Sequence, residues 1–229
     1  MIKNKKSLIK KLRLSAVFWP ALCAALLYCS WPLGLILNPI TTHHSLASQL
    51  EAPHQPYNWL FIAMDVGCGL LLAGIGIFQL RRGSHTRFLR MCIASYIIFG
   101  LLAAVAALVP LDCDPSTMVC GTVLHNPSFL LHGFCSIASV LFLLLDIILL
   151  AKWARSHQVS WVMQAVFAII LLGWAVFGLG SLLEIVDHIK NNILQDYFIT
   201  LCSISIIMTV ASVEYYKYLQ RHKKSLSSF

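Results

Sequence analysis

Two polar residues lie inside long apolar stretches of the chain and could do chemistry there. Asp65 falls seven residues into the stretch 58–80, about 10 Å along a helix, and His132 falls five residues into 127–151. Ser136 follows one helical turn later. A carboxylate in apolar surroundings is costly unless it is paired, protonated or hydrated, so Asp65 is a functional candidate. Carboxylate with imidazole suits Zn²⁺ or another divalent metal, and it equally suits general acid–base catalysis without a metal.

Polar residues near the ends of other apolar stretches could join these two. Asp112 follows the stretch 88–110, and Ser48 lies in the first long connecting segment. A metal site, with zinc as the favoured ion, would use Asp65, Asp112 and His132. A metal-free site would use the same groups as acid and base, with serine hydroxyls close by. The candidate catalytic residues are therefore Ser48, Asp65, Asp112, His132 and Ser136, and the secondary candidates are Asp114, Glu184 and His188.

Each candidate also has a simpler interpretation. Asp112 and Asp114 could cap a turn, and Glu184 could belong to a solvated loop face. Asp65 and His132 could form a structural hydrogen bond between two helices. No metal-binding spacing such as HExxH or HxxxH occurs in the chain, so the residue pattern leaves chemistry and structure both open.

The elements that carry these residues are predicted to be transmembrane helices. The chain is 59% hydrophobic and 11% charged, whereas a soluble domain carries about a quarter charged residues. Apolar stretches of about 20 residues span the hydrocarbon core. The sequence predicts an all-α, polytopic six-helix bundle over 15–216, flanked by basic segments at 1–14 and 217–229, with helices at 15–37, 58–80, 88–110, 127–151, 160–184 and 194–216.

The distribution of charge predicts the orientation of the bundle. Sixteen of the 17 Lys and Arg residues fall on one side of the predicted spans, and only Lys190 falls on the other. The positive-inside rule then places both termini in the cytoplasm and most Asp, Glu and His residues outside. The basic segments are predicted to contact anionic lipid headgroups rather than nucleic acid, because they are too dispersed to form a groove.

Three further patterns carry structural expectations. Cys113 and Cys120 share an outer loop, where an exported pair can form a disulfide; two free thiols are the alternative. Pro32 predicts an irregularity near the outer end of the first span. Ser139 and Asp146 continue the His132 stripe at seven-residue spacing, which predicts a polar seam facing the bundle.

Several motifs agree in order and spacing with a known family. The matching segments are Ser48-x-Leu50-Glu51-Ala52-Pro53, the segment from Gln55 to Phe61, Asp65-Val66-x-x-Gly69, and Pro110-Leu111-Asp112-Cys113 followed by Cys120, His132 and Ser136. They resemble the bacterial six-helix membrane family catalogued as domain of unknown function 998, and the outline is distantly similar to lipid-associated proteins of the Frag1/DRAM type. The resemblance implies the fold, the topology and a location in a bacterial plasma (inner) membrane. Position 51 carries less weight, because members often have another acidic or amide residue there.

The sequence supports two main classes of function. One is an outward-facing hydrolase or transferase that acts on a lipid or lipid-linked substrate through the Asp and His residues, with or without a divalent metal. The other is a non-enzymatic protein that binds or senses membrane lipids, in which the polar cluster is structural. A proton-coupled transporter is a third interpretation, since Asp65 and the polar seam could relay protons.

Overall fold

Long apolar runs separated by short polar segments fold as helices along most of this chain. The computed structural model describes residues 17–39, 47–53, 55–82, 86–109, 127–156, 159, 161–187 and 192–226. Its elements are α2 (Phe18–Tyr28), α3 (Trp31–Leu37), the 3₁₀ helix η1 (Ala47–Glu51), α5 (Asn58–Arg81), α6 (Arg87–Leu108), α7 (Pro127–Ser156), α8 (Trp161–Asp187) and α9 (Asn192–Leu226). These residues contain no strand, which confirms the predicted all-α class.

The described helices include five that are long and apolar enough to cross a membrane. Helices α2 and α3 make a sixth such span, bent by 47°, if the pair is counted as one. The predicted spans therefore correspond to the observed helices, although α9 continues to Leu226, beyond the predicted end at 216. The chain is a multi-pass membrane protein by the length and composition of these helices.

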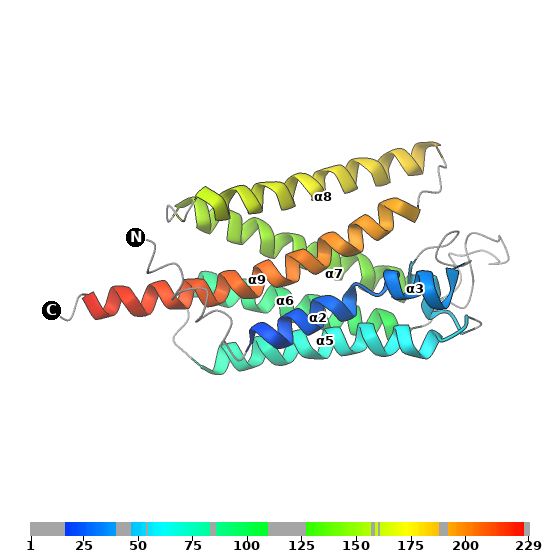
Figure 1. The fold of residues 1–229 in the computed structure, drawn as a ribbon, viewed down its shortest axis with the longest axis horizontal. Helices are drawn as coiled ribbons and strands as arrows, with labels where there is room; N and C mark the ends of the chain where they lie inside the picture. Colours follow the sequence, from blue (N-terminus) through cyan, green and yellow to red (C-terminus); the bar gives the residue numbers. More distant parts are fainter. Residues whose placement is uncertain are drawn as a thin grey trace.

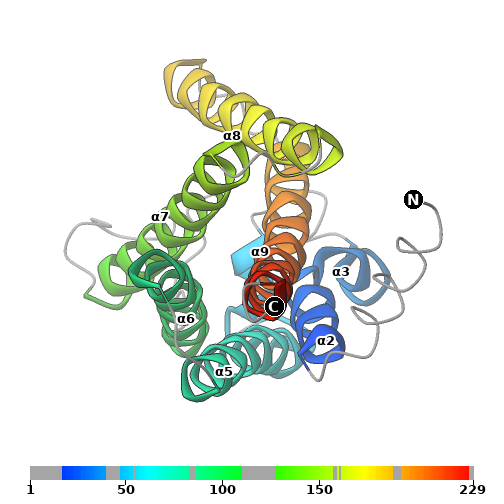
Figure 2. The same ribbon diagram turned by 90° about the vertical axis from the view of Figure 1, so that its left-hand side faces the viewer.

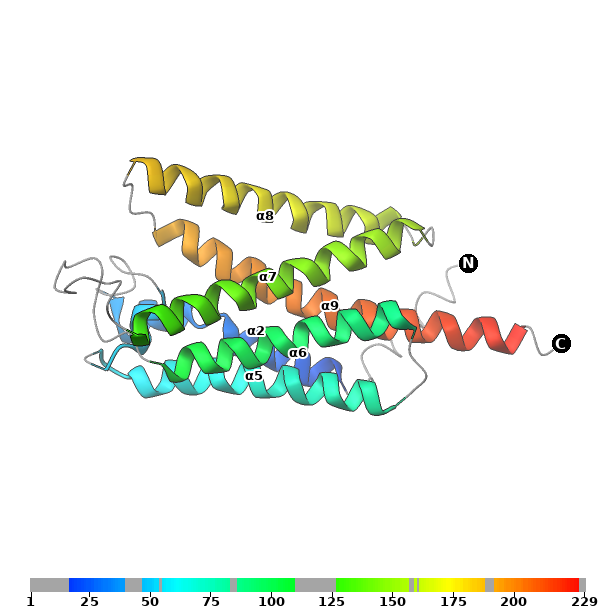
Figure 3. The ribbon, with the colours of Figure 1, turned by 180° about the vertical axis from the view of Figure 1, so that it is seen from behind.

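The helices run side by side, and α9 passes through the middle of the bundle (Figures 1 and 2). The first residues of α2 and the last residues of α9 lie at one end, and α3 and η1 lie at the other, as the reverse view also shows (Figure 3). Helix α8 is peripheral and packs against α7 and α9. The end of the bundle that holds α3 and η1 is called the cavity end below, and the opposite end is called the basic end.

The closest helix packing joins α5 to α6 through two glycines. A Cβ added at Gly69 would collide with the carbonyl oxygen of Gly100, and one added at Gly100 would lie 2.7 Å from the carbonyl oxygen of Gly69. Small residues let membrane helices approach this closely. Gly74, on the same helix α5, has nothing within 4 Å of an added Cβ, so only part of the glycine content of α5 serves packing.

The break between α2 and α3 follows from Pro32. Proline has no backbone N–H to bond to the carbonyl four residues earlier and its ring collides with that carbonyl, so the helix stops at Tyr28 and restarts at Trp31. This confirms the irregularity predicted near the end of the first span. Trp31 then donates from Nε1 to Thr200 Oγ1 of α9 at 3.1 Å, which fastens the redirected α3 to the bundle.

Helix α7 presents a polar seam to the bundle, as its seven-residue spacing predicts. His132, Ser139 and Asp146 are all buried, whereas Phe134 and Ile137 on the other face are largely exposed. The exposed face is apolar and faces the surroundings that a membrane provides. The polar seam therefore lies among the helices, where each of its members needs a partner or a function.

Candidate functional site

A cavity of about 280 Å³ lies among the helices at the cavity end. Its described walls come from the break between α2 and α3, from η1, and from α5, α6, α7 and α9. Most of the wall is apolar, with alanines of α6 and aromatic and aliphatic side chains of α5, α7 and α9. The polar residues of the wall are Tyr28, Ser30, Ser48, Glu51, Asp65, His132, Ser136 and Ser139.

The Pro32 break and η1 together build one side of this cavity. The wall includes Tyr28, the last residue of α2, and Ser30, which lies in the break between α2 and α3. The η1 turn is anchored there by Leu50, which is fully buried, and by Ala52. Asn38 at the end of α3 donates to Gln55 Oε1 at 2.9 Å, which ties α3 to the segment that leads from η1 into α5.

The carboxyl groups of Glu51 and Asp65 face each other at hydrogen-bonding distance. A hydrogen bond between two carboxyl groups requires at least one proton, because ionised carboxylates only accept. Glu51 is 6% exposed; its burial, and then the neighbouring Asp65, raise its pKa well above the ordinary value of 4.5. Glu51 is therefore the protonated donor and Asp65 the acceptor.

The pair leaves one oxygen unsatisfied. Asp65 lines the cavity and is half-buried as a residue, but its Oδ1 is fully buried and has no hydrogen-bond partner in the structure. A buried oxygen of this kind costs free energy unless a ligand or water satisfies it. The site is thus arranged to receive a donor.

His132 is held by the end of α6. Its Nδ1 lies 2.9 Å from the carbonyl oxygen of Ala106 and 3.0 Å from that of Val109. Carbonyl oxygens only accept, so Nδ1 carries a proton and donates it to them, which leaves Nε2 outside these bonds. The Ala106 carbonyl oxygen also accepts from the Val109 N–H at 3.1 Å. Helix α6 ends at Leu108, so the carbonyl of Val109 lies beyond the helix, and His132 supplies it with a donor.

The structure brings four of the predicted site residues to one cavity: Ser48, Asp65, His132 and Ser136. Asp65 pairs with Glu51 and His132 with α6, so the predicted Asp65–His132 hydrogen bond is not formed. Asp112, Asp114 and His188 lie outside the described residues, as do Cys113 and Cys120 of the predicted disulfide. Glu184 lies in α8 near its end at Asp187, but its side chain is outside the described part.

The metal hypothesis depends on a residue outside the described part of the chain. Among the described residues, no three His, Cys, Asp or Glu side chains are placed to hold a metal ion. Glu51, Asp65 and His132 share a cavity without converging on one point. A zinc site built on Asp65 and His132 would therefore need Asp112 and a closer approach of its ligands.

Glu51 is a residue of the cavity that was not among the predicted site residues. Position 51 was expected to vary among acidic and amide residues, whereas Glu51 is the hydrogen-bonding partner of Asp65. The available signal was the apolar setting, because Leu50 and Ala52 flank Glu51 in an otherwise polar segment. Tyr28, Ser30 and Ser139 were also not predicted to belong to the site; Ser139 was placed on the seam of α7 alone.

Comparison with known proteins places this site within a family. No curated protein and no solved structure matches the chain significantly. The family model described as "Protein of unknown function (DUF998)" matches residues 21–210, a range that includes every described residue of the cavity wall. The match confirms the resemblance inferred from the motifs of the sequence, and the chain belongs to the DUF998 family.

Proposed function

We propose that the protein is a membrane-embedded hydrolase or transferase that acts on a lipid or lipid-linked substrate by general acid–base catalysis. One observation carries the proposal: Glu51, Asp65 and His132, which can each exchange a proton, come from three elements and line one cavity of about 280 Å³. Two carboxyl groups that share a proton, together with an imidazole in the same cavity, are a set from which an acid and a base can be drawn.

The hydrogen bonds of the three groups suggest a role for each. Protonated Glu51 is the general acid that gives its proton to the leaving oxygen of the substrate. His132 Nε2 is the general base that takes the proton from an attacking water or hydroxyl group. Asp65 keeps Glu51 in position, and Ser48 and Ser136 border the same space, where their hydroxyls can orient the substrate. Acid–base assistance of this kind contributes about 10²–10⁴-fold to a rate.

The walls of the cavity support a membrane substrate. Phe61, Phe129 and Val140 line it together with alanines of α6, so an apolar portion of a ligand would be accommodated. Ligand pockets commonly measure about 300–1,000 Å³, and this cavity lies near the lower limit. It therefore suits a headgroup and its linkage, with the acyl chains of the lipid left in the bilayer.

The test uses purified protein in vesicles made from a total lipid extract of the expression host, with products identified by mass spectrometry. Glu51→Gln and His132→Gln are expected to lower the rate of product formation by at least about 100-fold, as removal of an acid or base does. Asp146→Asn is the matched control, because Asp146 is a buried carboxyl that does not line the cavity. Equal rates in all four proteins would contradict the proposal, as would the absence of any product.

The metal-dependent form of the proposal has its own test. Elemental analysis of the wild type beside His132→Ala would show about one zinc per chain that the variant loses, if Asp65, Asp112 and His132 are ligands. Equal metal content in both proteins would leave the metal-free acid–base mechanism. Full retention of zinc in Asp112→Ala would remove Asp112 from the site.

The alternative is a non-enzymatic lipid-binding protein, and the bonds of His132 to the end of α6 favour it. In that case His132 and the carboxyl pair hold the bundle together. Their replacement would then lower the thermal midpoint in parallel with lipid binding. Under the enzymatic proposal, Glu51→Gln lowers turnover at least about 100-fold while the protein retains its thermal midpoint.

A further inference from the structure

We propose that the cavity receives a protonated amine, so that its ligand is a lipid headgroup or small molecule ending in a primary ammonium group. The inference rests on the site of the proposed function and names the chemical class that this site takes. It is carried by the charge of the cavity wall, by the unsatisfied oxygen of Asp65, and by the aromatic side chains around it.

The charge of the described wall favours a cation. The wall contains two carboxyl groups and one imidazole, and none of its described residues is Lys or Arg. When Glu51 is protonated and Asp65 is ionised, the pair carries one negative charge. The arginines of α5 and α6, among them Arg81 and Arg87, are at the opposite ends of those helices. A phosphate or carboxylate inside the cavity would meet a carboxylate with no compensating charge, which is costly at low dielectric constant.

The unsatisfied oxygen gives the cation a place to bind. Asp65 Oδ1 is fully buried without a partner, while the carboxyl group as a whole is already paired with Glu51. An ammonium group has three donors and no acceptor. It would satisfy Oδ1 with a charge-assisted hydrogen bond, stronger than a bond between neutral groups. A neutral hydroxyl would also satisfy Oδ1 but would leave the charge of the pair uncompensated.

The remaining wall completes an ammonium site. Hydroxyls of Ser30 and Ser48 can accept the other two N–H bonds, and the aromatic residues Tyr28 and Phe61 line the same space. Cations bind to aromatic faces most strongly where water is excluded. Carboxylate, hydroxyl acceptors and aromatic rings around a small cavity form a combination that recognises an ammonium group and discriminates against its uncharged acyl derivative.

The test measures binding and needs no turnover. Wild-type protein in detergent is titrated with ethanolamine, N-acetylethanolamine and phosphate, and in nanodiscs with phosphatidylethanolamine or phosphatidylglycerol, with native mass spectrometry and thermal shift as readouts. Ethanolamine or phosphatidylethanolamine is expected to bind at least 10-fold more tightly than the acetylated or anionic probe. Binding of the lipid alone identifies a headgroup as the source of the amine; binding of both identifies the ammonium group as sufficient.

Variants locate the binding in the cavity. Asp65→Asn keeps the shape of the side chain and is expected to weaken amine binding at least 10-fold, whereas Asp146→Asn is expected to leave it unchanged. Equal affinity for charged and acetylated probes in the wild type would overturn the inference without any variant, as would unaltered binding by a folded Asp65→Asn protein. Amine binding without turnover would leave this inference standing and contradict the enzymatic proposal; turnover of a lipid without amine preference would do the reverse.

Discussion

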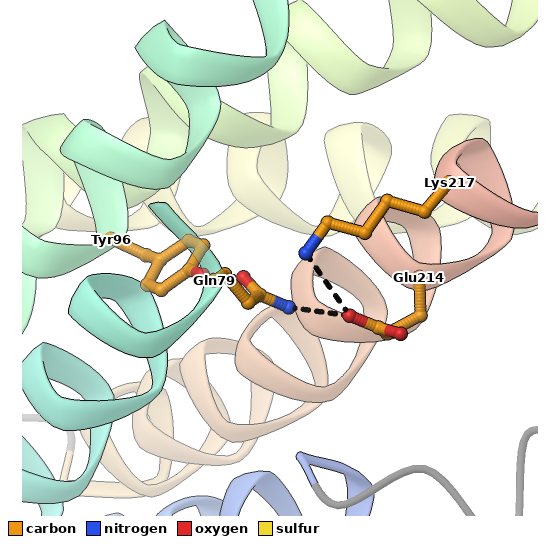
Figure 4. A network of polar contacts seen from close by, with 4 residues as sticks. All are labelled: Gln79, Tyr96, Glu214 and Lys217. Atoms are coloured by element: carbon orange, nitrogen blue, oxygen red, sulfur yellow. Dashed lines mark hydrogen bonds and ion pairs between the residues drawn. The ribbon is translucent and has the colours of Figure 1, made fainter. Parts of the chain in front are cut away.

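The two ends of the bundle bury polar groups in opposite ways. At the cavity end, Glu51 and Asp65 face open space and leave an oxygen for a ligand. Toward the basic end, Tyr96 donates to Gln79 Oε1, and Gln79 donates to Glu214 Oε1 at 3.0 Å. Lys217 Nζ completes this network with an ion pair to the same Glu214 oxygen at 3.4 Å (Figure 4). The network joins α5, α6 and α9, and its hydrogen bonds are made between protein groups without a ligand.

Asp146 resembles neither the carboxyl pair at the cavity end nor the polar network toward the basic end. It is 0% exposed and lies beside Thr209 and Cys92, yet neither carboxyl oxygen has a partner at normal hydrogen-bond geometry. It does not line the described cavity. Deep burial of a carboxyl therefore does not by itself mark a site. What distinguishes the cavity end is a second carboxyl that shares a proton together with space for a ligand.

The largest loss of stability is expected from a substitution in α5, the helix that contributes residues to both ends of the bundle. Gly69 lies on α5 between Asp65 and Gln79, and an added side chain there would collide with the backbone of Gly100. Gly69→Leu is expected to destabilise the protein by about 3 kcal/mol, at the upper part of the range for overpacking. Thermal unfolding in detergent measures this loss.

Gly74→Ala is the matched control for that substitution. Nothing lies within 4 Å of a Cβ at Gly74, and alanine has the better helix propensity. The control is therefore expected to be neutral or to gain up to about 1 kcal/mol. Equal losses in Gly69→Leu and Gly74→Ala would show that the close contact of α5 with α6 is not what joins the two ends.

The second-largest loss of stability is expected from Gln79→Leu, which tests whether the network at the basic end is structural. Gln79→Leu removes the partner of Tyr96 and one partner of Glu214, which leaves buried polar groups unsatisfied. The expected loss of stability is about 2 kcal/mol, with amine binding at the cavity end unchanged. A double-mutant cycle with Glu214→Gln would reveal the coupling. Loss of ligand binding in a stable Gln79→Leu protein would show that the two ends are not independent.

Much of this comparison can be predicted from the sequence, because helices and their buried faces depend on local spacing. The seven-residue repeat from His132 to Asp146 predicts the seam, and Pro32 predicts the break beside the cavity. The meeting of Ser48, Asp65, His132 and Ser136 follows from the lengths of the spans. These features need only the periodicity of each helix and the side of the membrane on which it ends.

The remaining features depend on contacts between distant segments. Asp65 and Asp146 look alike in the sequence, as single carboxylates in apolar helices; only the folded chain shows that the first has space and a partner. Glu51 becomes that partner because Leu50 anchors η1 in the bundle. His132 bonds to Ala106 and Val109 because α6 ends at Leu108, and the sequence gives that end only approximately.

Replacement of Asp146 is expected to change stability less than the substitutions above, and to raise it. Asp146→Leu removes a buried carboxyl whose oxygens have no partner at normal geometry, so the variant is expected to gain about 1 kcal/mol, near the lower limit of the cost of an unsatisfied group. Chemical denaturation in mixed micelles measures the gain. Asp65→Leu is the comparison, and it is expected to abolish amine binding. A substantial loss of stability in Asp146→Leu would show that Asp146 is held by contacts as effective as those of Glu214.

The last effect is a pH dependence of stability that originates at the cavity end. Burial and Asp65 raise the pKa of Glu51 above 4.5 in the folded protein, so the folded state binds more protons than the unfolded state above that pH. The stabilisation from Glu51 is complete below pH 4.5 and is lost as the pH rises through the folded pKa, by at most about 1.4 kcal/mol per pH unit. Glu51→Gln has no such proton to release, so its thermal midpoint should fall less steeply with rising pH. Parallel curves for the two proteins would mean that Glu51 is as ionised in the cavity as in the unfolded chain, and would remove it as the acid of the site.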